Sequence, residues 1–174
     1  AGGHAGTHDP LRAVPKVETA ELVREVRERM DLPVIAAGGV DGPEAVAALL
    51  EAGALAVQVG TLLLRTHEAG TSAAHRDGIR RCATGEGFVG PDGAARTVLT
   101  RAYTGRWART LATDFAAAHP DAPAAYPELN ALTTGLRAAA ATAGDLERVH
   151  LWAGTQAHTA REAGAADVVA GLTP

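Results

Sequence analysis

The chain has 174 residues, of which 47% are hydrophobic and 3% aromatic, and its formal net charge is −4. This length suggests about one domain, and the negative charge argues against nucleic acid or an anionic membrane as the main partner. The single cysteine, Cys82, excludes an intrachain disulfide, and no apolar run reaches the roughly 18 residues of a membrane span. Because no signal peptide is visible either, we expect a cytoplasmic protein.

The chain opens on residues 1–15, AGGHAGTHDPLRAVP, without an initiator methionine. A glycine pair followed by a histidine is typical of a strand end, but no strand precedes it, so we expect the C-terminal part of a longer protein. His4 is a candidate general base because imidazole titrates near neutral pH, and the alternative is a loop histidine bonded to the backbone. His4, His8 and Asp9 also have metal-binding side chains. We predict no metal site, because the glycines and the proline disfavour the helix that a His-x3-His pair requires.

The segment 17–30, VETAELVREVRERM, repeats apolar residues at helical spacing and predicts an amphipathic helix. Its charged residues are expected to form a solvated outer face. The apolar face is expected to carry Leu22, Val23, Val26 and Met30.

Two short apolar runs follow, 33–37 and 55–59, and the rest of the chain is arranged around them. Each run predicts a parallel strand, and the first run has the composition of a strand that is buried on both faces of its sheet. The helix between them starts at Gly42-Pro43, where the missing N–H of proline costs nothing, and Gly53 ends it. This order of helix, strand, helix and strand predicts a parallel α/β fold.

Each predicted strand ends in a turn of small residues, Gly38-Gly39 after the first and Gly60-Thr61 after the second. Two such turns at the same edge of a sheet present bare backbone N–H groups to an anion. In a (β/α)8 barrel the last two strand ends are a frequent phosphate site. A single glycine pair is more often only a turn, whereas two turns at this spacing favour a phosphate site.

The remainder of the chain is less regular. We expect a helix over 73–83 interrupted by Gly78, and then a glycine-rich loop over 84–97. A short strand from 97 and a helix from about 106 should follow, with a proline-rich connector over 120–127 after them. The chain should end with a helix over 128–143 stopped by Gly144, a loop over 152–156 and a closing helix to about 170. Four aromatic residues are interpreted as packing residues: Tyr103, Trp107, Tyr126 and Trp152.

Six motifs make the chain resemble the nitronate monooxygenases, formerly called 2-nitropropane dioxygenases. These motifs are AGGHAGT at 1–7, PVIAAGGV at 33–40, AVQVGT at 56–61, TRAYTGRWAR at 100–109, YP-x-x-N-x-LT at 126–133 and LWAG at 151–154. The first three also occur in the flavin-dependent enoyl-ACP reductases, and the later three favour the monooxygenases. The reductase remains an alternative, although no motif for an NAD(P)H site is visible.

The resemblance implies an α/β chain that forms the C-terminal portion of an FMN-binding (β/α)8 TIM barrel, with barrel units over 1–97 and a helical extension over 98–174. It implies the oxidation of alkyl nitronates or nitroalkanes with O2 by an oxidoreductase, with His4 as the base for neutral nitroalkanes. For the oligomeric state of the protein, we consider a homodimer. The positions that the resemblance assigns to FMN are Gly2, Gly38, Gly39, Gln58, Val59, Gly60 and Thr61.

One departure from the family is the absence of the earlier barrel strands, which supply further flavin contacts. Two whole parallel strands cannot bury both faces of a sheet as a barrel does. We therefore expect the isolated chain to be inactive and to bind FMN weakly. A third interpretation is a truncated α/β module that binds phosphate without being an enzyme.

Overall fold

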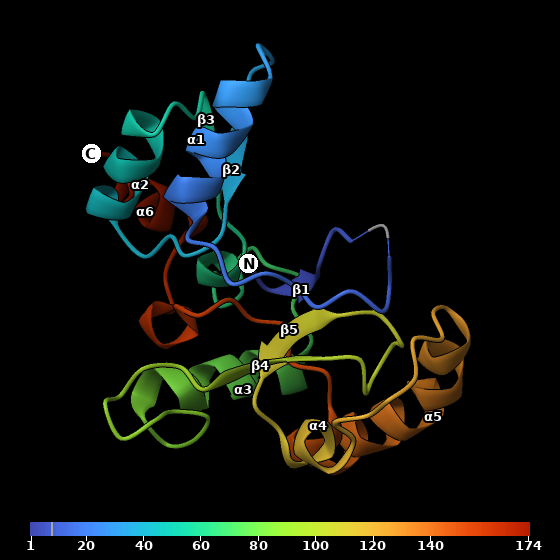
Figure 1. Cartoon of the computed structure of the whole chain (residues 1–174). Coiled ribbons are helices and arrows are strands. Elements are labelled where there is room, and N and C mark those ends of the chain that lie inside the picture. Colours follow the sequence, from blue (N-terminus) through green and yellow to red (C-terminus); the bar gives the residue numbers. More distant parts are fainter. Residues whose placement is uncertain (8) are drawn as a thin grey trace.

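The computed structural model describes residues 1–7 and 9–174 as two small sheets with helices packed around them (Figure 1). In chain order, the elements are β1 (Gly3–His4), α1 (Thr19–Arg29), β2 (Ile35–Ala37), α2 (Pro43–Glu51), β3 (Ala56–Gln58), the 3₁₀ helix η1 (Thr61–Leu63), α3 (Ala73–Thr84), β4 (Thr97–Thr100), β5 (Ala108–Leu111), α4 (Asp114–Ala118), α5 (Glu128–Ala143), the 3₁₀ helices η2 (Leu146–Arg148) and η3 (Ala157–Thr159), and α6 (Ala165–Ala170). Within the described residues, no helix combines the length and the apolar character that crossing a membrane requires.

The first sheet consists of β2 and β3, which pair in parallel as predicted. Helix α2 connects the two strands and starts with Pro43 in its first turn. Helices α1 and α2 lie close to this sheet in Figure 1, and one apolar cluster joins them to it through Val23, Ala36, Val46 and Leu49. This unit places the two glycine turns side by side, because both follow parallel strands at the same edge.

The prediction that the first strand is buried on both faces is wrong for this chain. Ala36 is buried, but the Ile35 side chain is 63% exposed, and Leu55, just before β3, is 71% exposed. Two parallel strands carry helices on one face only, and closing the other face requires the further strands of a barrel. The predicted apolar face of α1 is also less buried than expected, because Val23 is buried whereas Leu22 and Met30 are exposed.

The second sheet is antiparallel, with β5 between β1 and β4. The predicted helix from about residue 106 is wrong, because this segment forms β5. Ala108 and Leu111 are fully buried in the strand, which pairs with β4 on one side and β1 on the other. The helix begins only at α4, where the Thr113 hydroxyl accepts a hydrogen bond from the Ala116 N–H.

Helix α3 is continuous through Gly78, so the predicted interruption is also wrong. A Cβ atom at Gly78 would lie 2.8 Å from Cδ1 of Leu151, which is fully buried. The glycine therefore serves the close approach of a side chain from a distant segment. It does not break the helix.

Helix α5 has its predicted bounds, and Gly144 follows it in the left-handed conformation. The predicted closing helix is split into η3 and α6. Trp107 is only partly buried, and the guanidinium carbon of Arg101 lies 4.7 Å from its ring centroid. The interpretation of Trp107 as a buried packing residue is therefore correct only in part.

Candidate functional site

A cavity of about 410 Å³ lies where the turns after β2 and β3 meet the start of the chain. Its wall includes residues from five separate segments, namely the first three residues, the turn after β2, the turn after β3, helix α3 and residues 152–156. All seven positions that the family resemblance assigns to FMN line it: Gly2, Gly38, Gly39, Gln58, Val59, Gly60 and Thr61. The structure thus brings together residues that lie almost 60 positions apart in the sequence.

The turn after β2 depends on its two glycines for conformational reasons. Gly38 has φ +117° and Gly39 has φ +73°, which are left-handed conformations that side chains disfavour. A Cβ atom at Gly38 would also lie 2.8 Å from the backbone nitrogen of Ala1. The Thr19 hydroxyl donates a hydrogen bond of 3.0 Å to the Gly38 carbonyl, which ties the turn to α1.

The turn after β3 shows a different pattern. Gly60 has φ −121°, outside the left-handed region that favours glycine, and a Cβ atom there would meet no atom of the described residues within 4 Å. Packing among the described residues therefore does not require glycine at this position. Since Gly60 lines the cavity, its bare backbone leaves room for something inside the cavity to approach closely.

The Thr61 hydroxyl joins this turn to the 152–156 segment. Its Oγ1 accepts a hydrogen bond of 2.9 Å from the Gly154 N–H, which leaves the hydroxyl proton available for a second partner. On the other side, a Cβ atom at Gly2 would lie 2.7 Å from the carbonyl carbon of Ala153. Gly2 thus permits the start of the chain to pack directly on the backbone of this segment.

Sequence reasoning missed His75, which lies in the first turn of α3 and also lines the cavity. Its Nε2 is 2.9 Å from the Trp152 carbonyl oxygen and donates to it, since a carbonyl only accepts. Burial lowers the pKa of His75, and the bond to the carbonyl opposes this shift in part. Gly154 and Gln156 were also missed as lining residues, although the LWAG motif pointed to their segment.

The candidate base His4 lies on β1, opposite Ala108 of β5. Its Nε2 is 3.0 Å from the Thr104 Oγ1, and its ring centroid lies 5.4 Å from that of Tyr126 and 5.9 Å from that of Trp152. Burial, followed by the charge of Arg106, lowers the pKa of His4. The His4 side chain is outside the cavity wall, and Trp152 connects the two because its ring contacts His4 and it also lines the cavity.

The other side chains considered for metal binding are His8 and Asp9. His8 lies outside the described residues. The Asp9 carboxylate accepts a hydrogen bond of 2.9 Å from the Leu11 N–H, which is a local turn contact.

The family assignment follows from comparison with known proteins. The nitronate monooxygenase family model matches residues 1–174. The chain belongs to this family. It is 39% identical over 173 residues to a nitronate monooxygenase from Pseudomonas aeruginosa, covering 97% of this chain and 46% of that protein. It is 38% identical over 176 residues to one from Paraburkholderia phytofirmans, covering 99% and 45%. The chain thus spans about half the length of the curated relatives it matches.

Two solved structures extend the comparison with the nitronate monooxygenase family. Nitroalkane oxidase from Streptomyces ansochromogenes superposes with a TM-score of 0.83 at 43% identity, covering 99% of this chain and 48% of that structure. FabK from Thermotoga maritima gives 0.69 at 28% identity, covering 98% and 50%. Both are TIM barrels, so the predicted fold class is confirmed. The reductase alternative is less supported, because FabK is the more distant neighbour.

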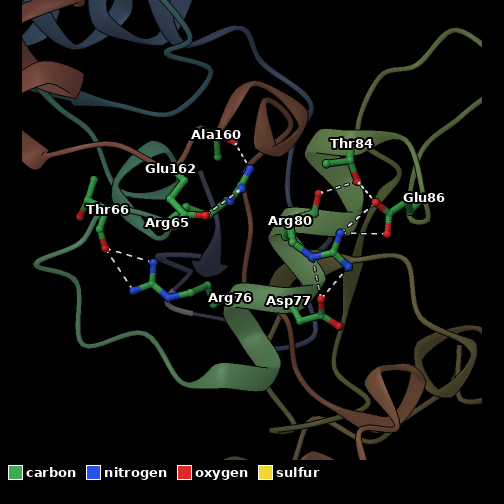
Figure 2. Close-up of polar contacts among 9 residues, drawn as sticks. All are labelled: Arg65, Thr66, Arg76, Asp77, Arg80, Thr84, Glu86, Ala160 and Glu162. Atoms are coloured by element: carbon green, nitrogen blue, oxygen red, sulfur yellow. Dashed lines mark hydrogen bonds and ion pairs between the residues drawn. The ribbon is translucent and has the colours of Figure 1, made fainter.

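In this nitronate monooxygenase chain, an arginine network anchors the segment after the Thr61 turn (Figure 2). Arg65 donates to the Ala160 carbonyl at 2.9 Å, and Arg76 donates two hydrogen bonds of 3.1 Å to the Thr66 carbonyl. At the other end of α3, Arg80 pairs with Asp77 and Glu86. Main-chain carbonyls held by partly buried guanidinium groups fix the chain path, and so this network positions the turn that lines the cavity.

Proposed function

We propose that the protein containing this chain is an FMN-dependent nitronate monooxygenase that oxidises alkyl nitronates and nitroalkanes with O2. The observation that carries the proposal is the convergence of seven family flavin positions, from three separate segments, on one cavity. Membership of the nitronate monooxygenase family supports it. The domain division near residue 97, the homodimer and the cytoplasmic location stay predictions.

The cavity fits a flavin on three counts. Its volume of about 410 Å³ falls in the usual range for small-molecule sites. The space where a Cβ atom of Gly60 would stand is empty, as a closely approaching phosphate requires. The Thr61 hydroxyl keeps a proton to donate. We assign the phosphate to the Gly38-Gly39 and Gly60-Thr61 turns.

When bound, FMN would supply the acceptor for the electrons that the nitronate loses, which no side chain supplies. The chain's own contribution to the chemistry is the base. His4 takes the α-proton of a neutral nitroalkane: the carbon–hydrogen bond breaks, its electron pair moves onto the nitro group, and the imidazole becomes imidazolium. The lowered pKa of His4 favours the neutral imidazole, which is the form that accepts a proton.

The proposal is tested on the whole protein with its visible absorption spectrum, followed by the addition of propionate 3-nitronate in air. We expect a flavin spectrum, oxygen uptake on addition of the nitronate, and no NAD(P)H consumption. Bleaching of the flavin by NAD(P)H without a response to nitronate would move the assignment to the reductases. If the protein contains no flavin, the cavity would bind another phosphate-bearing ligand instead.

The base assignment is tested separately with His4→Asn in the whole protein. Because a positioned base contributes on the order of 10²–10⁴-fold, we expect a loss of that size in kcat/KM for neutral nitroalkanes. Turnover of pre-formed nitronates, which have already lost the proton, should change little. An equal loss on both kinds of substrate would remove His4 from this role.

A further inference from the structure

Thr104 is a buried residue, 4% exposed, in the turn between β4 and β5, and it contacts the candidate base directly. Three polar atoms converge on its hydroxyl oxygen. They are the Nε2 of His4 at 3.0 Å, the Arg106 carbonyl oxygen at 3.2 Å and the Arg106 N–H at 3.3 Å. A threonine hydroxyl has one proton to donate and two lone pairs that accept.

One set of directions satisfies all three contacts at once. In it, the Arg106 carbonyl, which can only accept, takes the single hydroxyl proton, and the Arg106 N–H, which can only donate, bonds to Oγ1. The contact with His4 is then one in which Oγ1 accepts. In this arrangement neutral His4 carries its proton on Nε2, which leaves the lone pair on Nδ1.

We propose that Thr104 is a positioning residue that fixes His4 in the Nε2–H form, so that Nδ1 is the nitrogen that takes the proton from a nitroalkane. This inference rests on the proposed function, because it assigns a role beside the candidate base. It goes beyond that function by naming the basic nitrogen and the residue that selects it.

The turn that carries Thr104 is held firmly from three sides. Gly105 has φ +79°, and a Cβ atom there would lie 2.4 Å from the carbonyl carbon of Ala125. The Thr133 hydroxyl donates to the Tyr103 carbonyl at 2.5 Å. The Arg106 guanidinium donates to the Ala5 carbonyl at 3.3 Å, next to His4 in the chain. The hydroxyl therefore stays aligned with the imidazole.

The arrangement serves both protonation states of the base. During proton transfer the bond between the α-carbon and hydrogen breaks, a bond between Nδ1 and hydrogen forms, and the electron pair moves onto the nitro group. The resulting imidazolium still donates from Nε2 to Thr104, so this contact needs no rearrangement. A hydrogen bond from a cation is stronger than one from the neutral ring, so the same contact stabilises the product of the step.

The kinetic test compares three variants of the whole protein. Thr104→Val keeps the shape and removes the hydroxyl, and Thr104→Ser keeps the hydroxyl. Thr142→Val is the control, because it removes a hydroxyl on α5 that donates to the Ala138 carbonyl and does not contact His4 or the Thr104 turn. With a neutral nitroalkane, we expect Thr104→Val to lower kcat/KM on the order of tenfold or more, part of what a general base contributes. With a pre-formed nitronate, the kcat/KM of Thr104→Val should stay within about twofold of the wild-type value. The other two variants should stay within the same range on both substrates.

A second measurement needs no enzyme activity. Long-range ¹H–¹⁵N correlation spectra of ¹⁵N-histidine-labelled whole protein report which ring nitrogen carries the proton, with His4→Asn identifying the signal. We expect His4 to be protonated at Nε2 in the wild type and in Thr104→Ser, and to be a mixture of tautomers in Thr104→Val. A proton on Nδ1 in the wild type would overturn the inference, even if the protein is a nitronate monooxygenase. An equal kinetic loss on both substrates in Thr104→Val would do the same.

Discussion

Gly60 offers the sharpest test of the cavity, because the structure separates its effect on folding from its effect on a ligand. Gly60 has a negative φ, outside the left-handed region that favours glycine, and the new Cβ atom of Gly60→Val meets no atom of the described residues within 4 Å. Folding should therefore be preserved. The added methyl groups would instead stand in the cavity, at one of the two turns assigned to the phosphate.

The size of the effect follows from the contacts that the valine would displace. A hydrogen bond to a charged group contributes about 1.5–3 kcal/mol, and losing one such bond weakens binding roughly 10- to 150-fold. The second turn, Gly38-Gly39, is untouched, so binding should weaken without vanishing. We would prepare the whole protein without its cofactor and titrate it with FMN, following the change in flavin fluorescence.

Gly70→Val is the matched control, because Gly70 likewise has no protein atom within 4 Å of its Cβ position and lies outside the cavity wall. It should bind FMN like the wild type. Thermal unfolding of both variants would show whether the fold is intact. Full flavin retention in Gly60→Val, or equal loss in both variants, would refute the assignment of this turn to the phosphate.

Two further predictions concern stability. Gly78→Ala should destabilise the protein by about 1–3 kcal/mol, because the new methyl group would overlap Leu151. Gly135→Ala, on the exposed side of α5, should stabilise it by about 0.5–1 kcal/mol. Melting temperatures that shift in the same direction for both variants would contradict this. Burial and the Arg137 charge lower the pKa of His150 to about 4, below its ordinary value of 6.5, so the unfolded state binds more protons between these values. Stability should be complete above pH 6.5 and decline as the pH falls towards 4, and His150→Gln should flatten that decline in denaturant titrations.

The unit from β2 to β3 was predictable because its signals are local. The strands are short apolar runs, the helix begins with Pro43 in its first turn, and Gly38 and Gly39 mark a turn that only glycine adopts easily. The same signals located both turns of the candidate site. The exposed face of Ile35 was missed, because an apolar run does not show how many strands share its sheet.

The segments that sequence reasoning assigned wrongly depend on partners far along the chain. The residues of β5, Ala-Arg-Thr-Leu, suit a helix as well as a strand, and pairing with β1 and β4 decides the outcome. Gly78 resembles a helix breaker until Leu151 is known to pack on it. His75 and Thr104 were missed as site residues for the same reason, because Trp152 and His4, which they contact, lie far from them in sequence.

The pairing of β1 with β5 has a consequence for the order in which the site is assembled. His4 and Thr104 are separated by 100 residues, whereas the two glycine turns belong to one contiguous strand–helix–strand unit. Closing a long loop costs entropy that must be spent before its contacts form, so such pairings form late in folding. We therefore expect the chain to build its phosphate turns first and to dock the base last. On the proposed function, an intermediate that already holds a phosphate-bearing ligand would lack the base for neutral nitroalkanes until β1 has paired with β5.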